Sequence, residues 1–191
     1  MVRRKKYNTY RGTVGKVAPN ILERDFSTTA LNQKWVTDVS EFSLFGSKRY
    51  LSPIMDLYNR EIISFTITES PNLSMVTDML KKAFTLLPDD VDLIIHSDQG
   101  WHYQHPTYQQ MLRKKGIVQS MSRKGNCLDN SVMENFFGLL KQEIYYGVVY
   151  YSYEELKSKI ERFIKYYNEK RIKEKLRWMS PVQYRLHILA T

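Results

Sequence analysis

The chain has 191 residues, 42% of them hydrophobic, and a formal net charge of +9. This composition is typical of a folded globular protein and excludes a disordered one. The single cysteine, Cys127, excludes an internal disulfide framework and a CxxC metal site, and it indicates a reducing, cytoplasmic compartment. No apolar run is long enough for a membrane span, and the basic start of the chain lacks the apolar segment of a signal peptide, so no membrane partner is expected.

The positive charge is concentrated at the start of the chain. Residues 1–24 contain seven basic residues and one acidic residue. A dense positive arm attracts a polyanion, usually nucleic acid, but a solvated tail that only aids solubility has the same composition. The charge by itself leaves both interpretations open.

Three strands are predicted between residues 34 and 68. Apolar, β-branched and aromatic residues are frequent over 34–45, 49–59 and 61–68. The first two of these runs are separated by residues 46–48 and the last two by a turn at 58–60. Short turns between successive strands predict an antiparallel meander.

The rest of the chain alternates helices with short apolar strands. Apolar spacing predicts a helix over 73–87, ended by Pro88, and a buried strand within 91–100 that opens into a polar loop. A helix over 106–115, a short strand over 117–122, helices over 131–146 and 153–170, and a last helix starting at Ser180-Pro181 follow in that order. This order predicts an α/β (α+β) fold with one mixed five-stranded sheet flanked by helices.

Three carboxylates lie on three of these elements. Asp38 is placed in the first strand, where aspartate is rare, Asp98 at the end of the fourth strand, and Glu134 in the first turn of a helix. If the first strand is central and the fourth lies beside it, these side chains can converge. Converging carboxylates are ligands for Mg²⁺ or Mn²⁺.

Each carboxylate also has a purely structural interpretation. Asp38 could lie on an exposed edge strand, and Asp98 belongs to a Ser-Asp-Gln-Gly segment that suits a turn. Glu134 follows Ser131 by three positions, which is the spacing of a helix capping box. Composition and periodicity alone leave these alternatives open.

Longer segments around the carboxylates resemble a known family. They are WVTDVSEF at Asp38, HSDQGWHYQHPTY at Asp98, GIVQSMSRKGNCLDNSVMENFFGLLKQE at Glu134, and YYNEKRIKEKLRWMSPVQY near the end. From about residue 20 to 185 the chain resembles the OrfB transposases of the third large family of bacterial insertion sequences. That resemblance implies a retroviral-integrase-like catalytic core with a ribonuclease-H-like fold.

The spacing of these residues is the most specific part of the resemblance. Thirty-five residues separate Asp98 from Glu134, and Lys141 follows Glu134 by seven positions, both of which match the family. On a helix, positions 134, 138 and 141 share a face, and Gly138 leaves space there for a DNA backbone. The resemblance therefore implies that Asp38, Asp98 and Glu134 form a catalytic, metal-binding DDE triad.

The resemblance also implies the chemistry. Two Mg²⁺ or Mn²⁺ ions would be held by the triad, with Asp38 bridging them, and would promote strand cleavage followed by attack of a DNA 3′-OH. No covalent protein–DNA intermediate is needed. Rival hypotheses are a ribonuclease-H-like nuclease that does not join strands, and an inert, truncated DNA-binding remnant of a transposase.

Several polar residues are expected to support the substrate or the helix carrying Glu134. Lys141 is expected to contact a phosphate, and the loop before that helix, through Arg123, Lys124 and Asn126, to position DNA. That segment could equally be an ordinary solvated loop. Asp129, Asn130 and Ser131 are expected to cap the helix or order the site.

The histidines offer no clear metal pattern. His96, His102 and His105 are irregularly spaced and only one cysteine is present, so zinc is not expected. His96 is predicted to pack near a strand end, and the other two to lie in the loop after Asp98.

The predicted organisation has three parts. Residues 1–26 are expected to be a basic remnant of a missing N-terminal DNA-binding region, 27–150 the catalytic core, and 151–191 a helical extension. Relatives usually carry a helix-turn-helix region before the core, so an upstream partner protein could supply it. The expected partners are element ends and target DNA, with a homo-oligomer bridging the ends in the bacterial cytoplasm, at the nucleoid.

Overall fold

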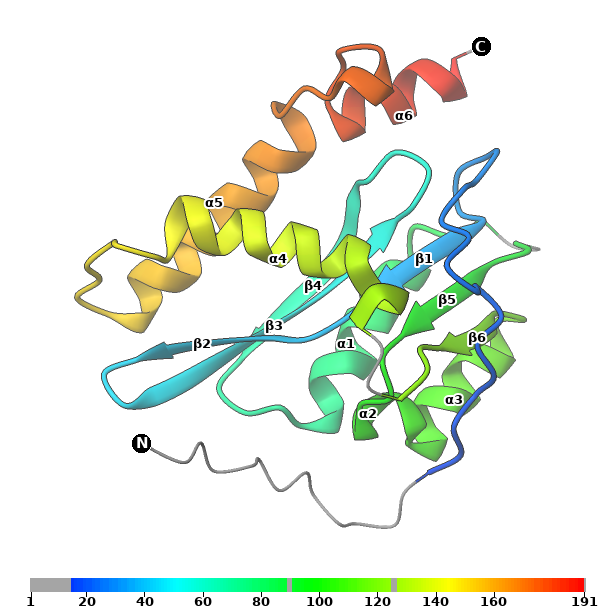
Figure 1. Cartoon of the computed structure of the whole chain (residues 1–191), viewed down its shortest axis with the longest axis horizontal. Helices are drawn as coiled ribbons and strands as arrows, with labels where there is room; N and C mark the ends of the chain where they lie inside the picture. Colours follow the sequence, from blue (N-terminus) through cyan, green and yellow to red (C-terminus); the bar gives the residue numbers. More distant parts are fainter. Residues whose placement is uncertain (1–14, 89–90, 125–126, 191) are drawn as a thin grey trace.

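The computed structural model describes residues 15–88, 91–124 and 127–190 (Figure 1). Its strands are β1 (Lys34–Thr37), β2 (Ser40–Leu44), β3 (Ser47–Asp56), β4 (Ile62–Thr68), β5 (Ile94–Ser97) and β6 (Val118–Met121). Its helices are α1 (Leu73–Phe84), α2 (Trp101–Gln104), α3 (Pro106–Lys114), α4 (Ser131–Ile144), α5 (Tyr153–Glu169) and α6 (Pro181–Leu189), with short 3₁₀ turns η1 (Cys127–Asn130) and η2 (Glu174–Leu176).

The sheet is mixed, as predicted. Strands β2, β3 and β4 pair antiparallel and β1 pairs antiparallel with β3, which confirms the meander. Strand β1 also pairs in parallel with β5, and β5 with β6. The first strand is therefore central and lies beside the strand that precedes Asp98, as the convergence of the carboxylates requires.

The first predicted strand is interrupted, so the sheet contains six strands within the described residues instead of five. The break falls at Asp38 and Val39, between β1 and β2. There the Asp38 carboxylate accepts a hydrogen bond of 2.7 Å from the Val39 N–H. A short acidic side chain that binds a neighbouring backbone N–H competes with strand pairing. Asp38 thus lies just beyond β1 and not within a continuous strand.

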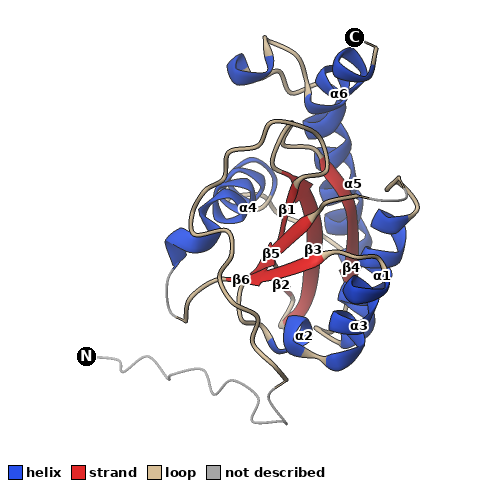
Figure 2. Cartoon of the chain, turned by 90° about the vertical axis from the view of Figure 1, so that its right-hand side faces the viewer, coloured by secondary structure: helices blue, strands red, loops and turns tan. Residues whose placement is uncertain are grey.

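Alternating side chains divide the core into two clusters on the two faces of the sheet. In β1, Trp35 packs with the cluster that includes α1 and α3, whereas Val36 packs with the cluster that includes α4 and α5. The alternation follows from the two-residue period of a strand. Figure 2 shows α1 and α3 on one side of the sheet and α4 on the other.

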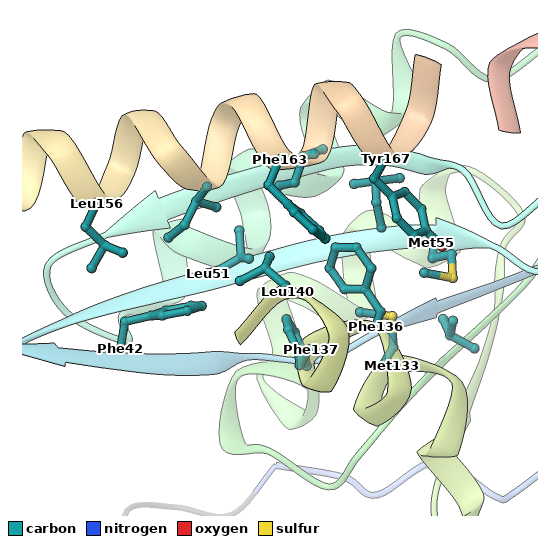
Figure 3. Close-up of a cluster of buried hydrophobic side chains, with 14 of the residues drawn as sticks. Phe42, Leu51, Met55, Met133, Phe136, Phe137, Leu140, Leu156, Phe163 and Tyr167 are labelled. Carbon is teal, nitrogen blue, oxygen red and sulfur yellow. The ribbon is translucent and has the colours of Figure 1, made fainter. Parts of the chain in front are cut away.

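Helix α5 covers the second cluster as its apolar stripe predicts. Leu156, Ile160, Phe163 and Tyr167 are all buried there. Figure 3 shows Phe136 and Leu140 of α4 beneath α5, so the two helices and the sheet share one apolar layer. None of the helices in the described residues is long and apolar enough to cross a bilayer.

The helix boundaries follow their caps. Helix α1 ends at Phe84, before the predicted stop at Pro88. Helix α6 begins with the reciprocal capping box of Ser180 and Gln183, which confirms the predicted start. At α5 the Ser152 hydroxyl accepts from the Glu155 N–H, but the Glu155 carboxylate binds the Tyr151 N–H, so only half of the predicted capping box forms.

A buried polar network holds the C-terminal helix against the turn between β3 and β4. Asp56 is fully buried, and its carboxylate accepts hydrogen bonds from the Asn32 and Tyr58 N–H groups and from Arg185 of α6. Arg185 also pairs with Glu61. The Asn59 amide, likewise buried, donates to the Pro181 carbonyl. These contacts tie α6 to the core across more than 120 positions of sequence.

We predict that Arg185→Ala lowers the free energy of unfolding by about 3 kcal/mol, because it leaves the buried Asp56 carboxylate without its cation. Urea denaturation at pH 7 measures the change. Arg113→Ala, which removes an exposed arginine at the end of α3, is the matched control and should change stability by less than about 0.5 kcal/mol. Equal effects of the two substitutions would contradict the role of the network.

Candidate active site

Asp38 is the centre of the candidate site. It is half-buried at the end of β1, and burial, followed by the charge of Asp98, raises its pKa to about 7. Glu134 adds a smaller repulsion in the same direction. The other two predicted carboxylates, Asp98 and Glu134, thus lie close enough for their charges to act on Asp38.

Asp98 is held by the loop that follows β5. Its carboxylate accepts a 2.8 Å hydrogen bond from the Gly100 N–H, and a Cβ atom at Gly100 would lie 2.9 Å from the same oxygen. The residue opens to solvent on one side, while the protein around the rest of the carboxylate partly desolvates it and raises its pKa. Only a residue without a side chain fits this turn without displacing Asp98.

Tyr103 is a residue of the site that the sequence analysis did not single out. It is fully buried, and its pKa is raised by burial first and then by the charges of Asp38 and Asp98. It lies in α2, a one-turn helix too short for periodicity to reveal. Its buried hydroxyl therefore lies within electrostatic range of both aspartates.

Glu134 lies on the exposed face of α4. The helix begins at Ser131 with Asn130 in the N-cap position, and Asn130 makes no side-chain capping bond. Ser131 is therefore the first helical residue and not the cap, and the capping box considered for Glu134 is absent. This leaves the Glu134 carboxylate available on the side of the helix that faces Asp38.

Gly138 and Lys141 share the face of Glu134. Lys141 is half-buried and its ammonium lies 5.2 Å from the centre of the Phe42 ring. Burial lowers its pKa, whereas the charges of Glu41 and Asp38 act in the opposite direction. Nothing lies within 4 Å of a Cβ built on Gly138, so this face is open between the carboxylate and the ammonium.

These carboxylates do not form a closed cage. Within the described parts of the chain, no three His, Cys, Asp or Glu side chains lie close enough to be a ready-made metal site. However, the donor set fits a hard divalent cation, because carboxylate oxygens are its preferred ligands. A cation near Asp38 would also relieve the repulsion and desolvation that raise the pKa of this group.

Asp129 organises the loop before α4 by ion pairing. Its carboxylate, almost fully buried, accepts hydrogen bonds from Asn20, from Arg24, and from the backbone and guanidinium of Arg123. The Arg123 pairing, the largest cause, holds the pKa of Asp129 well below its usual range. Asp129 thus binds two arginines, Arg24 and Arg123. Two nitrogens of the Arg123 guanidinium are already hydrogen-bonded to its carboxylate.

The other predicted residues of the loop before α4 differ in their distance from the carboxylates. Lys124 is exposed in a turn, and Asn126 lies outside the described residues. Asn130 is buried beside Asp38 and stabilises its charge, although the two groups do not form a well-aligned hydrogen bond. Of the three predicted capping or ordering residues, Asn130 is the one next to the carboxylates.

The histidines lie at separate places. His96 is fully buried between the hydroxyls of Ser120 and Ser122, at 2.8 and 3.1 Å, and burial lowers its pKa. His102 binds the Pro71 carbonyl, and His105 caps α3 through the Thr107 N–H. His96 thus packs near the strand end, as predicted, and each ring has a structural partner.

We predict that Asp129→Asn lowers the free energy of unfolding by about 1–2 kcal/mol at pH 7, a modest value because Arg24 and Arg123 are themselves 42% and 58% exposed. The folded-state pKa lies below the unfolded value near 4, so the stabilisation is present above pH 4 and is lost as the pH falls further. Denaturation between pH 3 and 7 measures this, with the exposed Asp92→Asn as control. A wild-type advantage that does not change with pH would contradict it.

Comparisons with known proteins agree with this architecture. The integrase core domain family matches residues 28–127, and a second integrase core family matches residues 134–189. The fold is similar to that of the HTLV-2 integrase catalytic core domain, solved in complex with magnesium, with a TM-score of 0.64 and 16% identity over 81% of this chain and 96% of that one. This likeness confirms the predicted integrase-like fold.

Two relatives from bacteria are much more similar in sequence. Over 181 residues the chain is 51% identical to a protein named as transposase InsK of insertion sequence element IS150 in Escherichia coli K12, which covers 95% of this chain and 64% of that protein. Over 184 residues it is 52% identical to a transposase-like protein of Haemophilus influenzae, covering 96% and 85%. The chain therefore belongs to the integrase-core family of insertion-sequence transposases.

Proposed function

We propose that this chain is the catalytic core of a transposase that cuts DNA strands and joins their 3′ ends to other DNA. The observation that carries the proposal is the position of Asp38 directly after central strand β1, beside β5 and Asp98, where burial and the charges of Asp98 and Glu134 also raise its pKa. A half-buried carboxylate at the end of a central strand, with the charges of Asp98 and Glu134 acting on it, is costly for a purely structural site. Perturbed carboxylates of this kind are typical of sites that bind cations or substrate.

The triad would hold divalent metal, Mg²⁺ or Mn²⁺. The HTLV-2 core with a similar fold was solved with magnesium, and the oxygen donors here suit the same ion. When bound, a pair of such ions activates the attacking oxygen and stabilises the leaving oxygen of a phosphodiester. Asp38, on which the charges of both other carboxylates act, would be the shared ligand if two ions bind.

The other residues of the site orient the carboxylates and the DNA. Gly100 fixes Asp98 through its N–H, and Asn130 stabilises the charge of Asp38. Lys141, on the same face of α4 as Glu134, would neutralise a phosphate of the strand that lies along the helix. Lys124, with Arg123 and Asn126, would contact the strand from the preceding loop.

The proposed division of the chain places catalysis in residues 27–150 and the docking helices in 151–191. The DNA partners would be element ends and target, bridged by a homo-oligomer at the nucleoid, and end recognition would come from a helix-turn-helix region or partner. A nuclease without joining activity and an inert remnant are not favoured, because the relatives are named transposases.

We predict that Glu134→Gln abolishes metal-dependent nicking and strand transfer on labelled DNA ends. The substitution keeps the size of the side chain and removes its charge, so the loss should exceed the ~10–100-fold that follows from changing groups outside a metal's ligand sphere. Glu169→Gln, at an exposed carboxylate on α5, is the control and should retain full activity. Products that persist unchanged in Glu134→Gln would refute the proposed role, and nicks without joined products would establish the nuclease alternative.

We predict that Gly138→Gln separates stability from function. Replacing a helical glycine should raise the free energy of unfolding by about 0.5–1 kcal/mol, and there is open space for the side chain. The same side chain would obstruct DNA between Glu134 and Lys141, so strand transfer should fall at least tenfold. Gly138→Ala is the matched control, with a similar gain in stability and little loss of activity. Undiminished joining by Gly138→Gln would show that DNA does not pass over this face.

A further inference from the structure

A recess lies on a different face of α4 from Glu134. It is a pocket of about 730 Å³ between α4, the β3–β4 turn and the segment around η2. Ser131 and Asn135 contribute to its wall, and they are close neighbours of Glu134 in sequence. Because residues 134 and 135 differ by 100° around a helix, the pocket and the candidate active site are adjacent but distinct.

Two half-buried cations face this pocket. Arg60 and Lys173 both line it, and the Arg60 guanidinium forms no ion pair or hydrogen bond with any residue that the structure describes. Lys173 donates a 2.6 Å hydrogen bond to the Tyr167 hydroxyl and lies over its ring. Burial, and then the charges of Arg60 and Arg171, lower the pKa of Lys173 to about 8. Within the described residues neither cation therefore has an ion-pair partner, although the buried Asp56 carboxylate acts on Arg60 at longer range.

The backbone at Arg60 adds a second observation. Its φ of 62° lies in the left-handed region, where glycine or asparagine is preferred. The turn is fixed there by the buried Asn59 amide, which binds Glu61 and the Pro181 carbonyl. The rigid turn therefore holds the Arg60 backbone in one conformation beside the pocket.

The other walls of the pocket are largely apolar and aromatic. Phe26, Leu57, Tyr58, Leu139 and Leu176 line it together with the edges of core residues. Figure 3 shows Met55, Phe136 and Tyr167, three of these core residues, gathered at one end of the apolar layer. The charged lining residues are Arg60, Lys173 and Lys175 against Glu174, which leaves an excess of positive charge.

We propose that this pocket binds one unpaired nucleotide of a DNA strand, with its phosphate on Arg60 and Lys173 and its base against the apolar wall. The volume suits a small organic group and exceeds what a bare phosphate needs. Cations beside aromatic or apolar surfaces are the usual way of holding a single strand. A helix is only about 10–12 Å across, so a strand at Glu134 reaches the pocket by crossing α4. The inference rests on the proposed action on DNA.

The test is the binding of a fluorescent single-stranded oligonucleotide, without metal, at several salt concentrations. Arg60→Asn removes the charge and suits the left-handed backbone, and Lys173→Met removes the second cation. Each should weaken binding at least tenfold near 0.1 M salt and reduce the salt slope of log K by about 0.7. The matched controls are Arg113→Asn and Lys165→Met, which remove exposed cations elsewhere and should change affinity less than about twofold.

A fluorescent base analogue in the oligonucleotide reports the nucleotide itself. Its emission should change on binding to the wild-type chain and not with Arg60→Asn. Inorganic phosphate that binds while the oligonucleotide does not, equal binding by pocket and control variants, or no binding by the wild type would each overturn the proposal. Oligonucleotide binding is measured without metal and without catalysis, whereas strand transfer is measured separately with Glu134→Gln, so failure of the pocket and failure of the proposed catalysis are distinguishable. Circular dichroism of Arg60→Asn checks that the fold is retained.

Discussion

The packing of helix α4 across one face of the sheet is the constraint on which the candidate active site depends, because this helix carries Glu134. Its buried side, through Met133, Phe136 and Leu140, is part of the apolar layer that also contains α5 and strand β3. The face beside this buried stripe carries Glu134 and Lys141. Because a packed helix has little freedom to rotate, burial of one stripe determines where the carboxylate and the ammonium lie relative to Asp38.

The side chains of the site are rigidly placed, and their charges strongly influence one another. Burial and like charge raise the pKa of Asp38, whereas Lys141 brings a positive charge to the same region. Because burial and like charge disfavour the ionised form of Asp38, a bound cation would stabilise this carboxylate. The opposite charge dominates at Arg60 and Lys173, two cations that line a pocket with an excess of positive charge. Both faces of α4 therefore present charges suited to complementary ligands.

The C-terminal segment contributes more than additional length. Helix α5 closes the second core cluster, and α6 reaches back to the β3–β4 turn through Arg185 and the Asn59 amide. This turn carries Arg60. The extension thus supports the apolar layer beneath α4 and also shapes one wall of the neighbouring pocket, so it is structurally continuous with the core.

Much of the fold follows from local patterns in the sequence. The meander, the buried strand before Asp98, and helices α1, α3, α4 and α5 were predictable because hydrophobic periodicity and capping residues act over a few positions. The identity of Asp38, Asp98 and Glu134 came from their spacing in segments that resemble a family. Helix α2 and the role of Tyr103 were missed, since a single turn has no measurable period.

What the sequence by itself determined is most of the elements and the candidate carboxylates, because these depend on short-range order along the chain. Only the tertiary structure decided that β1 ends just before Asp38, that Asp129 holds Arg24 and Arg123, and that the predicted capping box of Glu134 does not form. It also decided that Arg60 and Lys173, 113 positions apart, share one pocket. The burial of a group and the charges around it depend on residues that are distant in sequence. Local sequence patterns do not show which distant residues come together in the folded chain.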